Sequence, residues 1–284
     1  MSSFRAPTEA DVPEIARIAS EDWPEPTDAD LVQRWWSSPG FDRELDARIE
    51  PGAYAHVLAF DETRAWIDVR GHPSPTLLDW AEERARVRGV RVLTGAWMPS
   101  EKLRDDLRDR GFTPIRHAFR MSIDLEGASV QPVWPEGIRP RTYRDGDARR
   151  FYDAGNDTFE DTWEPIVPSF EEWSHAVLDR PSFDPSLWFL AEEGGEVAGF
   201  AICRIHEVDR ALGWVHFLGV RKRWRGRGVG RALLLTALES FRRRGLSRAS
   251  LGVDAENPTG ATRLYESIGM RVSAHFDIYE KVDR

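Results

Sequence analysis

The two halves of the chain repeat one order of secondary-structure signals. In the first half a helical pattern ends at Gly89, and a strand pattern, a short helical pattern and Gly111 follow. In the second half the same series runs from Gly245 to Gly269. Glycine directly after a helix adopts the left-handed conformation that ends it at little steric cost. A repeat of this length indicates a duplicated domain rather than a solenoid of short repeats.

A linker is predicted near the middle of the chain. The segment "EGASVQPVWPEG", residues 126–137, is rich in Pro, Gly and small residues and lacks a helical period, which is typical of linkers. We therefore expect a first domain at 1–126, a linker at 127–136 and a second domain at 137–284. In the second domain we expect strands at 187–191, 197–205, 212–220, 246–254, 272–274 and 276–281, and helices at 229–244 and 259–268. This alternation predicts a mixed α/β sheet.

Composition limits the class of protein. The chain has 284 residues, 41% of them hydrophobic, and a formal net charge of −9. No apolar stretch reaches the length of a membrane span, and the N-terminus lacks a signal-peptide pattern. The lone Cys203 cannot form an internal disulfide, so we expect a soluble protein of the reducing cytoplasm with no membrane partner. The acidic total argues against nucleic-acid binding.

The sequence "RWRGRGVGRALLL", residues 223–235, predicts an anion site. Arginines surround three glycines, and a leucine-rich helical pattern follows. The N–H groups of a first helical turn and the helix dipole favour negative charge. Glycine lets backbone approach a phosphate closely, and arginine adds charge-assisted hydrogen bonds. A solvated charged turn is the alternative on charge alone.

The glycine spacing discriminates among phosphate loops. No GxxxxGK string is present, and the third glycine of a GxGxxG fingerprint would fall at Arg231. The spacing Arg225-x-x-Gly228-x-Gly230 resembles the acyl-CoA pyrophosphate loop of the GCN5-related N-acetyltransferase (GNAT) family. "HFLGV" before the loop and "NPTGATRLYESIGM" after it resemble that family's splayed strand and last helix. The resemblance covers most of 137–284 and is closer to the tandem-domain, mycothiol-synthase-like members.

The resemblance implies a fold of two tandem GNAT-type domains and an acetyl-CoA-dependent N-acetyltransferase. The acetyl group would pass directly to a primary amine of a small molecule in a ternary complex, with no metal. The chain would be a monomer or a homodimer. The residues implied for acetyl-CoA binding are Leu218, Gly219, Val220, Arg225, Gly226, Arg227, Gly228, Val229, Gly230, Arg231 and Asn257.

Two side chains are candidates for proton transfer. Under the resemblance, Tyr265 lies near the thiol and would protonate the leaving thiolate, since a phenol is neutral at working pH. The alternative is a packing tyrosine. His216 would accept the amine proton, directly or through water; the alternative is a satisfied histidine on a half-buried strand. A backbone N–H at a strand bulge around Leu218 would stabilise the carbonyl oxygen.

The catalytic base has further candidates. The resemblance implies a glutamate at the position where this chain has Trp214. Glu207 and Asp254 are reserve bases, and a water chain would need no named base.

The segment 156–173 is predicted to shape the acceptor cleft. It carries Phe159 and Trp163, which we group with Trp214 as acceptor-contacting residues, and acidic side chains lie between the aromatic ones. An aromatic wall with carboxylates suits a cationic amine. Surface-helix packing is the alternative.

The first half shows the same order of secondary-structure signals but lacks the glycine loop. At "IDVRGHPSPTLLDWAEERA", residues 67–85, only Gly71 remains, and Pro73 and Pro75 remove two backbone donors. Leu107 stands where Tyr265 stands in the second half. We therefore expect a degenerate copy that does not bind CoA. For the whole chain, the alternative function is an acyl-CoA-binding sensor or pseudoenzyme without turnover, and longer acyl donors stay open.

Overall fold

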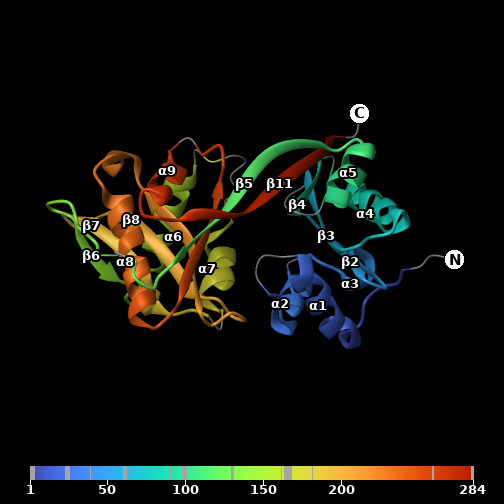
Figure 1. Ribbon diagram of the computed structural model, residues 1–284, viewed down its shortest axis with the longest axis horizontal. Coiled ribbons are helices and arrows are strands. Elements are labelled where there is room, and N and C mark those ends of the chain that lie inside the picture. Colours follow the sequence, from blue (N-terminus) through green and yellow to red (C-terminus); the bar gives the residue numbers. More distant parts are fainter. Residues whose placement is uncertain are drawn as a thin grey trace. The chain divides into compact units, whose positions relative to one another are not determined.

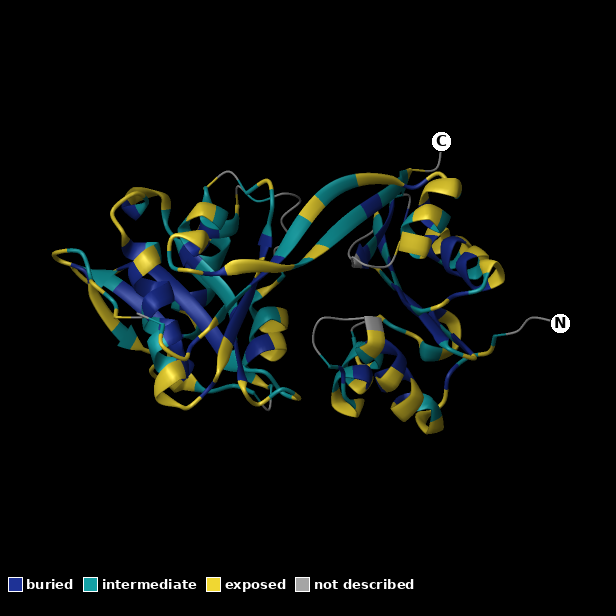
Figure 2. Cartoon of the chain, viewed as in Figure 1, coloured by how far each residue is buried: buried dark blue, intermediate teal, exposed yellow. Residues whose placement is uncertain are grey.

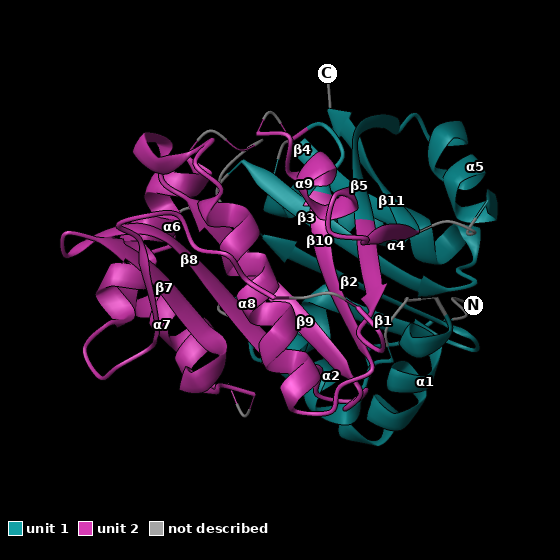
Figure 3. Ribbon diagram, turned by 60° about the vertical axis from the view of Figure 1, so that its left-hand side comes forward, with its two compact units in different colours: residues 1–119, 254–256, 274–284 teal, residues 120–253, 257–273 magenta. Residues whose placement is uncertain are grey.

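The chain folds into two compact units (Figure 3). The computed structural model describes residues 4–22, 26–38, 40–59, 63–89, 91–97, 101–128, 131–160, 162, 168–180, 182–257 and 259–282. Unit 1 comprises residues 1–119, 254–256 and 274–284, and unit 2 comprises 120–253 and 257–273. Strands β5 (Thr113–Asp124) and β11 (Arg271–Val282) each begin in one unit and end in the other. The domain limits 1–126 and 137–284 therefore stay a prediction.

Unit 1 is a mixed sheet covered by helices (Figure 1). Its helices are α1 (Val12–Asp22), α2 (Ala29–Trp36), α3 (Arg43–Asp46), α4 (Pro75–Arg88) and α5 (Glu101–Asp109). Its strands, besides β5 and β11, are β1 (Ala47–Glu50), β2 (Ala53–Ala59), β3 (Arg64–Gly71) and β4 (Arg91–Trp97). The strand order is β1-β2-β3-β4-β11, and only the β3–β4 pair among these is parallel. Leu107 of α5 is buried in this core, as expected for a packing residue.

From β7 on, unit 2 repeats the order of elements that unit 1 has from β1 on. Its helices are α6 (Ala148–Phe159), α7 (Phe170–Leu178), α8 (Val229–Arg243) and α9 (Ala261–Glu266). Its own strands are β6 (Arg139–Thr142), β7 (Trp188–Glu193), β8 (Glu196–Ile205), β9 (Leu212–Val220) and β10 (Arg248–Asp254). The strand order is β10-β9-β8-β7-β6, with β9 and β10 parallel and the other pairs antiparallel. The predicted mixed α/β class is confirmed.

One predicted pair of strands is wrong. The closing strands expected at 272–274 and 276–281 form the single strand β11. His275, the residue left between them, is part of this strand. The other predicted elements of unit 2 agree with the structure to within about two residues, and α9 begins late because Gly260 precedes it in a left-handed conformation, with φ 72°.

Helices cover both faces of the sheet in unit 2. A Cβ on Gly199 of β8 would lie 3.1 Å from Leu233 of α8. The next residue, Phe200, packs against Phe151 and Phe159 of α6. Successive side chains of a strand point to opposite faces, so α8 covers one face and α6 the other. The buried strand residues and exposed outer helix surfaces are visible in Figure 2.

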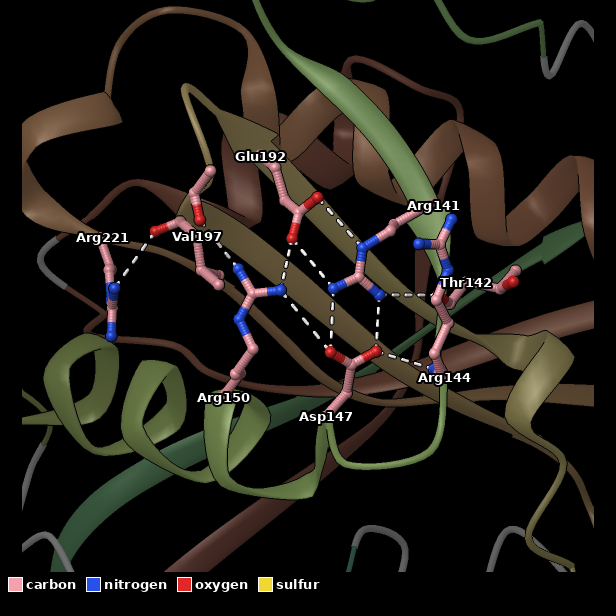
Figure 4. A network of polar contacts seen from close by, with 9 residues as sticks. Arg141, Thr142, Arg144, Asp147, Arg150, Glu192, Val197 and Arg221 are labelled. Carbon is pink, nitrogen blue, oxygen red and sulfur yellow. Dashed lines mark hydrogen bonds and ion pairs between the residues drawn. The ribbon is translucent and has the colours of Figure 1, made fainter.

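A network of ion pairs fixes the start of α6 (Figure 4). Arg141 of β6 donates to both oxygens of Asp147, at 2.5 and 2.9 Å, and to Glu192 of β7 at 2.9 Å. Arg150, in the first turn of α6, donates to the same Glu192 at 2.5 Å. The two carboxylates thus join two strands to the helix whose far end, at Phe159, reaches the candidate site.

Candidate active site

Strands β9 and β10 separate beside the glycine loop. Their parallel pairing runs from Leu212↔Arg248 to Val215↔Leu251 and ends there. On its other side β9 stays paired with β8 as far as Val220. Within these fully described strands, residues 216–220 therefore have one edge that no longer pairs with β10. The backbone of Leu218–Val220, predicted to pair with a pantetheine arm, lies on this open stretch.

A β-bulge occurs where the strands separate. Ile202 of β8 faces Phe217 and Cys203 faces Val215, so His216 is an extra residue on β9. The bulge reverses the facing of the strand: a Cβ on Gly213 would meet Phe241 of α8, whereas one on Gly219 would meet Thr158 of α6. In a regular strand these two glycines would share a face. The bulge expected around Leu218 is thus at His216, since register depends on the partner strand.

The glycine loop ends as the N-cap of α8. Gly226 and Gly228 have φ of 74° and 87°, and Gly228 is the N-cap residue without a side-chain capping bond. Residues other than glycine rarely adopt such φ values. The first N–H groups of α8, at residues 229–231, follow this cap. An uncapped helix N-terminus preceded by two left-handed glycines fits a pyrophosphate.

Acidic side chains compensate much of the positive charge of the basic turn. Arg221 pairs with Asp157 and Lys222 with Glu160, both at the end of α6. Arg227 donates to Glu193 at 2.6 Å, and this bond holds the pKa of Glu193 at about 2. We infer that backbone N–H groups and the helix dipole, more than side-chain charge, would hold an anion here.

Two of the predicted loop arginines make structural contacts. Arg225 donates to the carbonyls of Val220 at 3.0 Å and Thr158 at 3.2 Å, and so ties the end of β9 to α6. Arg231 donates to the Ser267 hydroxyl at 2.8 Å, beyond the end of α9. These contacts hold the loop against two helices.

Helix α9 lies against the start of α8. Leu264 approaches within 3.4 Å of the position that a Cβ on Gly230 would take. Tyr265 follows it, is 6% exposed, and burial raises its pKa to about 12. The Asn257 side chain accepts hydrogen bonds from the N–H of Thr259 at 2.9 Å and from its hydroxyl at 2.5 Å. Tyr265 and Asn257 thus lie on the segment that packs beside the loop.

The candidate bases differ in their surroundings. Burial, then the charges of Arg204 and Arg180, lower the pKa of His216 to about 3, although its side chain is only half-buried by exposed area. Glu207 accepts a hydrogen bond from Ser182 at 2.7 Å. Asp254 is held by Arg116 at 2.7 Å and belongs to unit 1. Partial burial and the nearby arginines therefore favour the neutral imidazole, and His216 is a weaker base than an ordinary histidine.

The predicted acceptor residues are only partly brought together. Phe159 packs against Phe217, with ring centroids 5.7 Å apart. Trp214 lies under the guanidinium of Arg120, whose Cζ is 4.2 Å from the ring centroid. Trp163 lies outside the described residues. Sequence reasoning missed Arg120, because its place between apolar residues of β5 gave no sign of a contact with β9.

Two general findings concern ions and membranes. In the described part of the chain, His, Cys, Asp and Glu side chains form no group of three placed to hold a metal ion. No described helix has the length and apolar character to cross a membrane.

Known proteins resemble this chain over much or all of its length. Residues 148–270 match the family model "Acetyltransferase (GNAT) family". A mycothiol acetyltransferase of Salinispora arenicola is 32% identical over 298 residues, covering 95% of this chain and 92% of that protein. A mycothiol acetyltransferase of Thermobispora bispora is 38% identical over 168 residues, which cover 56% of this chain and only 55% of the relative.

Solved structures agree in fold. A GCN5-related N-acetyltransferase from Sphaerobacter thermophilus superposes with a TM-score of 0.81 at 32% identity, covering 98% of this chain and 95% of that one. A tandem GNAT protein from the clavulanic acid biosynthesis pathway has a TM-score of 0.74 at 15% identity, with 98% of both chains covered, and supports the fold alone. The predicted family and the tandem fold are confirmed, and the chain belongs to the GCN5-related N-acetyltransferase family.

Proposed function

We propose that this chain transfers the acetyl group of acetyl-CoA to a primary amine of a small molecule, at one site in unit 2. One observation carries the proposal: β9 separates from β10 at a bulge, and its open stretch leads directly into the Gly228-capped helix. Such a strand edge offers hydrogen bonds to an extended amide-bearing arm, and the helix N-terminus offers them to a pyrophosphate.

The proposed roles in donor binding follow from these positions. Backbone groups of Leu218, Gly219 and Val220 would pair with the pantetheine amides. The loop at 226–231 would bind the pyrophosphate, while Arg225 holds it in place. Asn257, whose side-chain oxygen is already engaged, would use its amide N–H₂ toward the CoA arm.

The chemistry needs a deprotonated amine, a stabilised oxyanion and a protonated leaving thiolate. The amine nitrogen forms the new C–N bond and the thioester C–S bond breaks. A backbone N–H of the bulged segment 216–218 would stabilise the oxyanion. Tyr265 would give its proton to the sulfur, because its raised pKa keeps it protonated at working pH. His216 is a weak base, so we place it as a neutral hydrogen-bond partner of a water that carries the amine proton away to solvent. A proton from solvent then returns to the Tyr265 phenolate and restores the phenol.

The acceptor is proposed only as an amine. The relatives named above are mycothiol acetyltransferases, which makes a mycothiol precursor one compound to test. Trp214, under Arg120, occupies the position where the resemblance implies a glutamate. That substitution also supports the second candidate, an acyl-CoA-binding sensor without turnover.

Turnover separates these two candidates. The purified chain is mixed with acetyl-CoA and a panel of primary amines, and thiol release is followed together with the mass of the acetylated product. We expect release that depends on the amine and is lost in Gly228→Asp. Acetyl-CoA binding without release for any amine would favour the sensor, and absence of binding would contradict both.

A further inference from the structure

One buried hydroxyl of unit 2 has no hydrogen-bond partner among the described residues. It is Oγ1 of Thr158, in the last turn of α6, and the residue is 9% exposed. A hydroxyl that is removed from water and left unpaired costs free energy. Such groups are rare in folded proteins, and a binding role is one reason for a protein to keep one.

Other hydroxyls inside helices of this chain are satisfied locally. Ser20 of α1 donates to the carbonyl of Ala16 at 2.7 Å. Thr236 of α8 donates to the carbonyl of Ala232, also at 2.7 Å. In both cases the acceptor belongs to the residue four positions earlier, which is the usual partner of a helical serine or threonine. Thr158 does not use the equivalent carbonyl, so its side-chain conformation is set by a contact outside α6.

That contact is with the open stretch of β9. A Cβ on Gly219 would come within 2.6 Å of Cγ2 and 3.1 Å of Cβ of Thr158, so a larger residue at 219 would push α6 away from the strand. Gly219 is the middle residue of 218–220, the part of β9 that no longer pairs with β10. The methyl group of Thr158 therefore covers the stretch that we propose for the pantetheine arm.

Two further contacts hold the end of α6 at this place. Arg225 of the glycine loop donates to the carbonyl of Thr158 at 3.2 Å. The ring of the next residue, Phe159, packs against Phe217 of β9, with centroids 5.7 Å apart. These contacts fix the backbone of Thr158 relative to both the strand and the loop. Its side chain can then change position by rotation about the Cα–Cβ bond.

One such rotation brings the hydroxyl to the strand. Threonine in helices occupies two rotamers of this bond, and their exchange moves the hydroxyl to the position now held by the methyl group. The oxygen atom then lies beside Gly219, where it can donate a hydrogen bond to an oxygen or accept one from an N–H. The pantetheine arm of acetyl-CoA carries two amides and a hydroxyl, so it offers both kinds of partner.

We propose that the Thr158 hydroxyl binds the donor, through a hydrogen bond to an amide or hydroxyl group of the pantetheine arm lying along 218–220. This inference rests on the proposed acetyl transfer and adds a side chain that recognises the arm. The hydroxyl lowers the stability of the free chain, and the donor supplies its partner. The same group therefore has opposite effects on stability and on donor affinity.

Thr158→Val tests both effects. Valine has nearly the shape of threonine and a similar helix propensity, but it lacks the hydroxyl. The thermal midpoint of the full chain without ligand should rise by about 2–4 °C, because an unpaired buried hydroxyl is removed. Acetyl-CoA should bind about 3- to 10-fold more weakly by calorimetry, because the hydrogen bond to the arm is lost.

Two variants and one truncated ligand show whether the hydroxyl itself is responsible. Thr158→Ser keeps the hydroxyl but loses the methyl group, so the thermal midpoint should fall while acetyl-CoA affinity stays within about twofold. Thr236→Val is the matched control, because the Thr236 hydroxyl is bonded within α8; it should neither raise the midpoint nor change the affinity. 3′-Phosphoadenosine 5′-diphosphate keeps the pyrophosphate and lacks the arm, so Thr158→Val should bind it as tightly as the unaltered chain does.

Failure of this inference is distinct from failure of the proposed function. Equal acetyl-CoA affinity of Thr158→Val and the unaltered chain would overturn the inference, while acetyl transfer stands. An affinity of Thr158→Ser as low as that of Thr158→Val, or an equal loss for the truncated ligand, would also overturn it, because the hydroxyl would not be what recognises the arm. Absence of acetyl-CoA binding by the unaltered chain would contradict the proposed function itself, and this inference with it.

Discussion

The two units share one order of elements, from β1 in unit 1 and from β7 in unit 2, but the N-termini of the equivalent helices α4 and α8 differ. In unit 2 the long loop 221–228 joins β9 to α8, and Gly228 leaves the helix without a side-chain cap. In unit 1 the short connection 72–74 joins β3 to α4, and Ser74 caps the helix by accepting from the Leu77 N–H at 3.2 Å. One helix start is open to a ligand and the other is closed by the chain.

Unit 1 also supplies its own anion at this position. The carboxylate of Glu50 accepts hydrogen bonds from the Ser74 N–H at 2.6 Å and the Ser74 hydroxyl at 2.8 Å, and Glu50 is 7% exposed. The β2–β3 register is regular, without the bulge seen at His216. We propose that one connection and one extra strand residue decide whether each copy of the duplicated domain can bind acetyl-CoA.

The largest expected effect comes from Gly228→Asp in unit 2. Its φ of 87° strains any side chain, and the new carboxylate would repel the pyrophosphate. We expect acetyl-CoA to bind at least about 100-fold more weakly by calorimetry. Gly245→Asp is the matched control, because Gly245 has φ 78° and open space around it at the other end of α8. Equal affinity of Gly228→Asp and the unaltered protein would remove the loop from the site.

Tyr265→Phe should slow turnover by about 10- to 100-fold with little change in acetyl-CoA affinity. The hydroxyl is proposed to protonate the thiolate, whereas the ring supplies the packing. Tyr279→Phe is the control, since Tyr279 is a fully buried tyrosine of unit 1 whose hydroxyl has no hydrogen-bond partner among the described residues. Turnover that is equal in Tyr265→Phe and the unaltered protein would make Tyr265 a packing residue.

His56 of unit 1 should make stability fall in acid. Burial lowers its pKa to about 4, partly offset by Asp68, while an unfolded histidine titrates near 6.5. Between these pH values the unfolded state binds more protons, so stability rises with pH and levels off above about 6.5. We expect His56 to account for roughly 3 kcal/mol of the loss between pH 7 and pH 4.

Urea unfolding at several pH values measures this contribution. His56→Leu should reduce the loss of unfolding free energy between pH 7 and pH 4 by that amount. His72→Leu, at an exposed residue, should leave this loss unchanged. His216, with a pKa of about 3, would maintain part of the slope in the variant. An identical slope in His56→Leu and the unaltered protein would contradict the assignment.

The smallest expected effect comes from Glu50→Gln. Replacing the carboxylate weakens its bonds to Ser74 and should lower the free energy of unfolding by about 1–2 kcal/mol. Acetyl-CoA affinity should not change, because the residue belongs to the closed helix start. Glu21→Gln, at an exposed residue of α1, provides the control. A loss of acetyl-CoA affinity in Glu50→Gln would connect unit 1 to ligand binding.

The sequence predicted features that depend on local pattern. The glycine spacing located the loop, and apolar periodicity located α8 and the strands before it. Contacts between distant segments were not predictable in the same way. The bulge at His216 depends on the register of β9 with β8. The pairing of Arg221 with Asp157 depends on how α6 packs, and the stacking of Arg120 on Trp214 depends on where β5 lies. The periodicity of one segment does not reveal which distant segment it will contact.

The most direct test of the comparison is the number of acetyl-CoA molecules bound per chain. A calorimetric titration of the purified protein with acetyl-CoA measures this number and the affinity together. We predict one site per chain, because Gly228 leaves one helix start open while Ser74 and Glu50 close the other. Two sites per chain would contradict that assignment of unit 1, and no binding would contradict the assignment of unit 2.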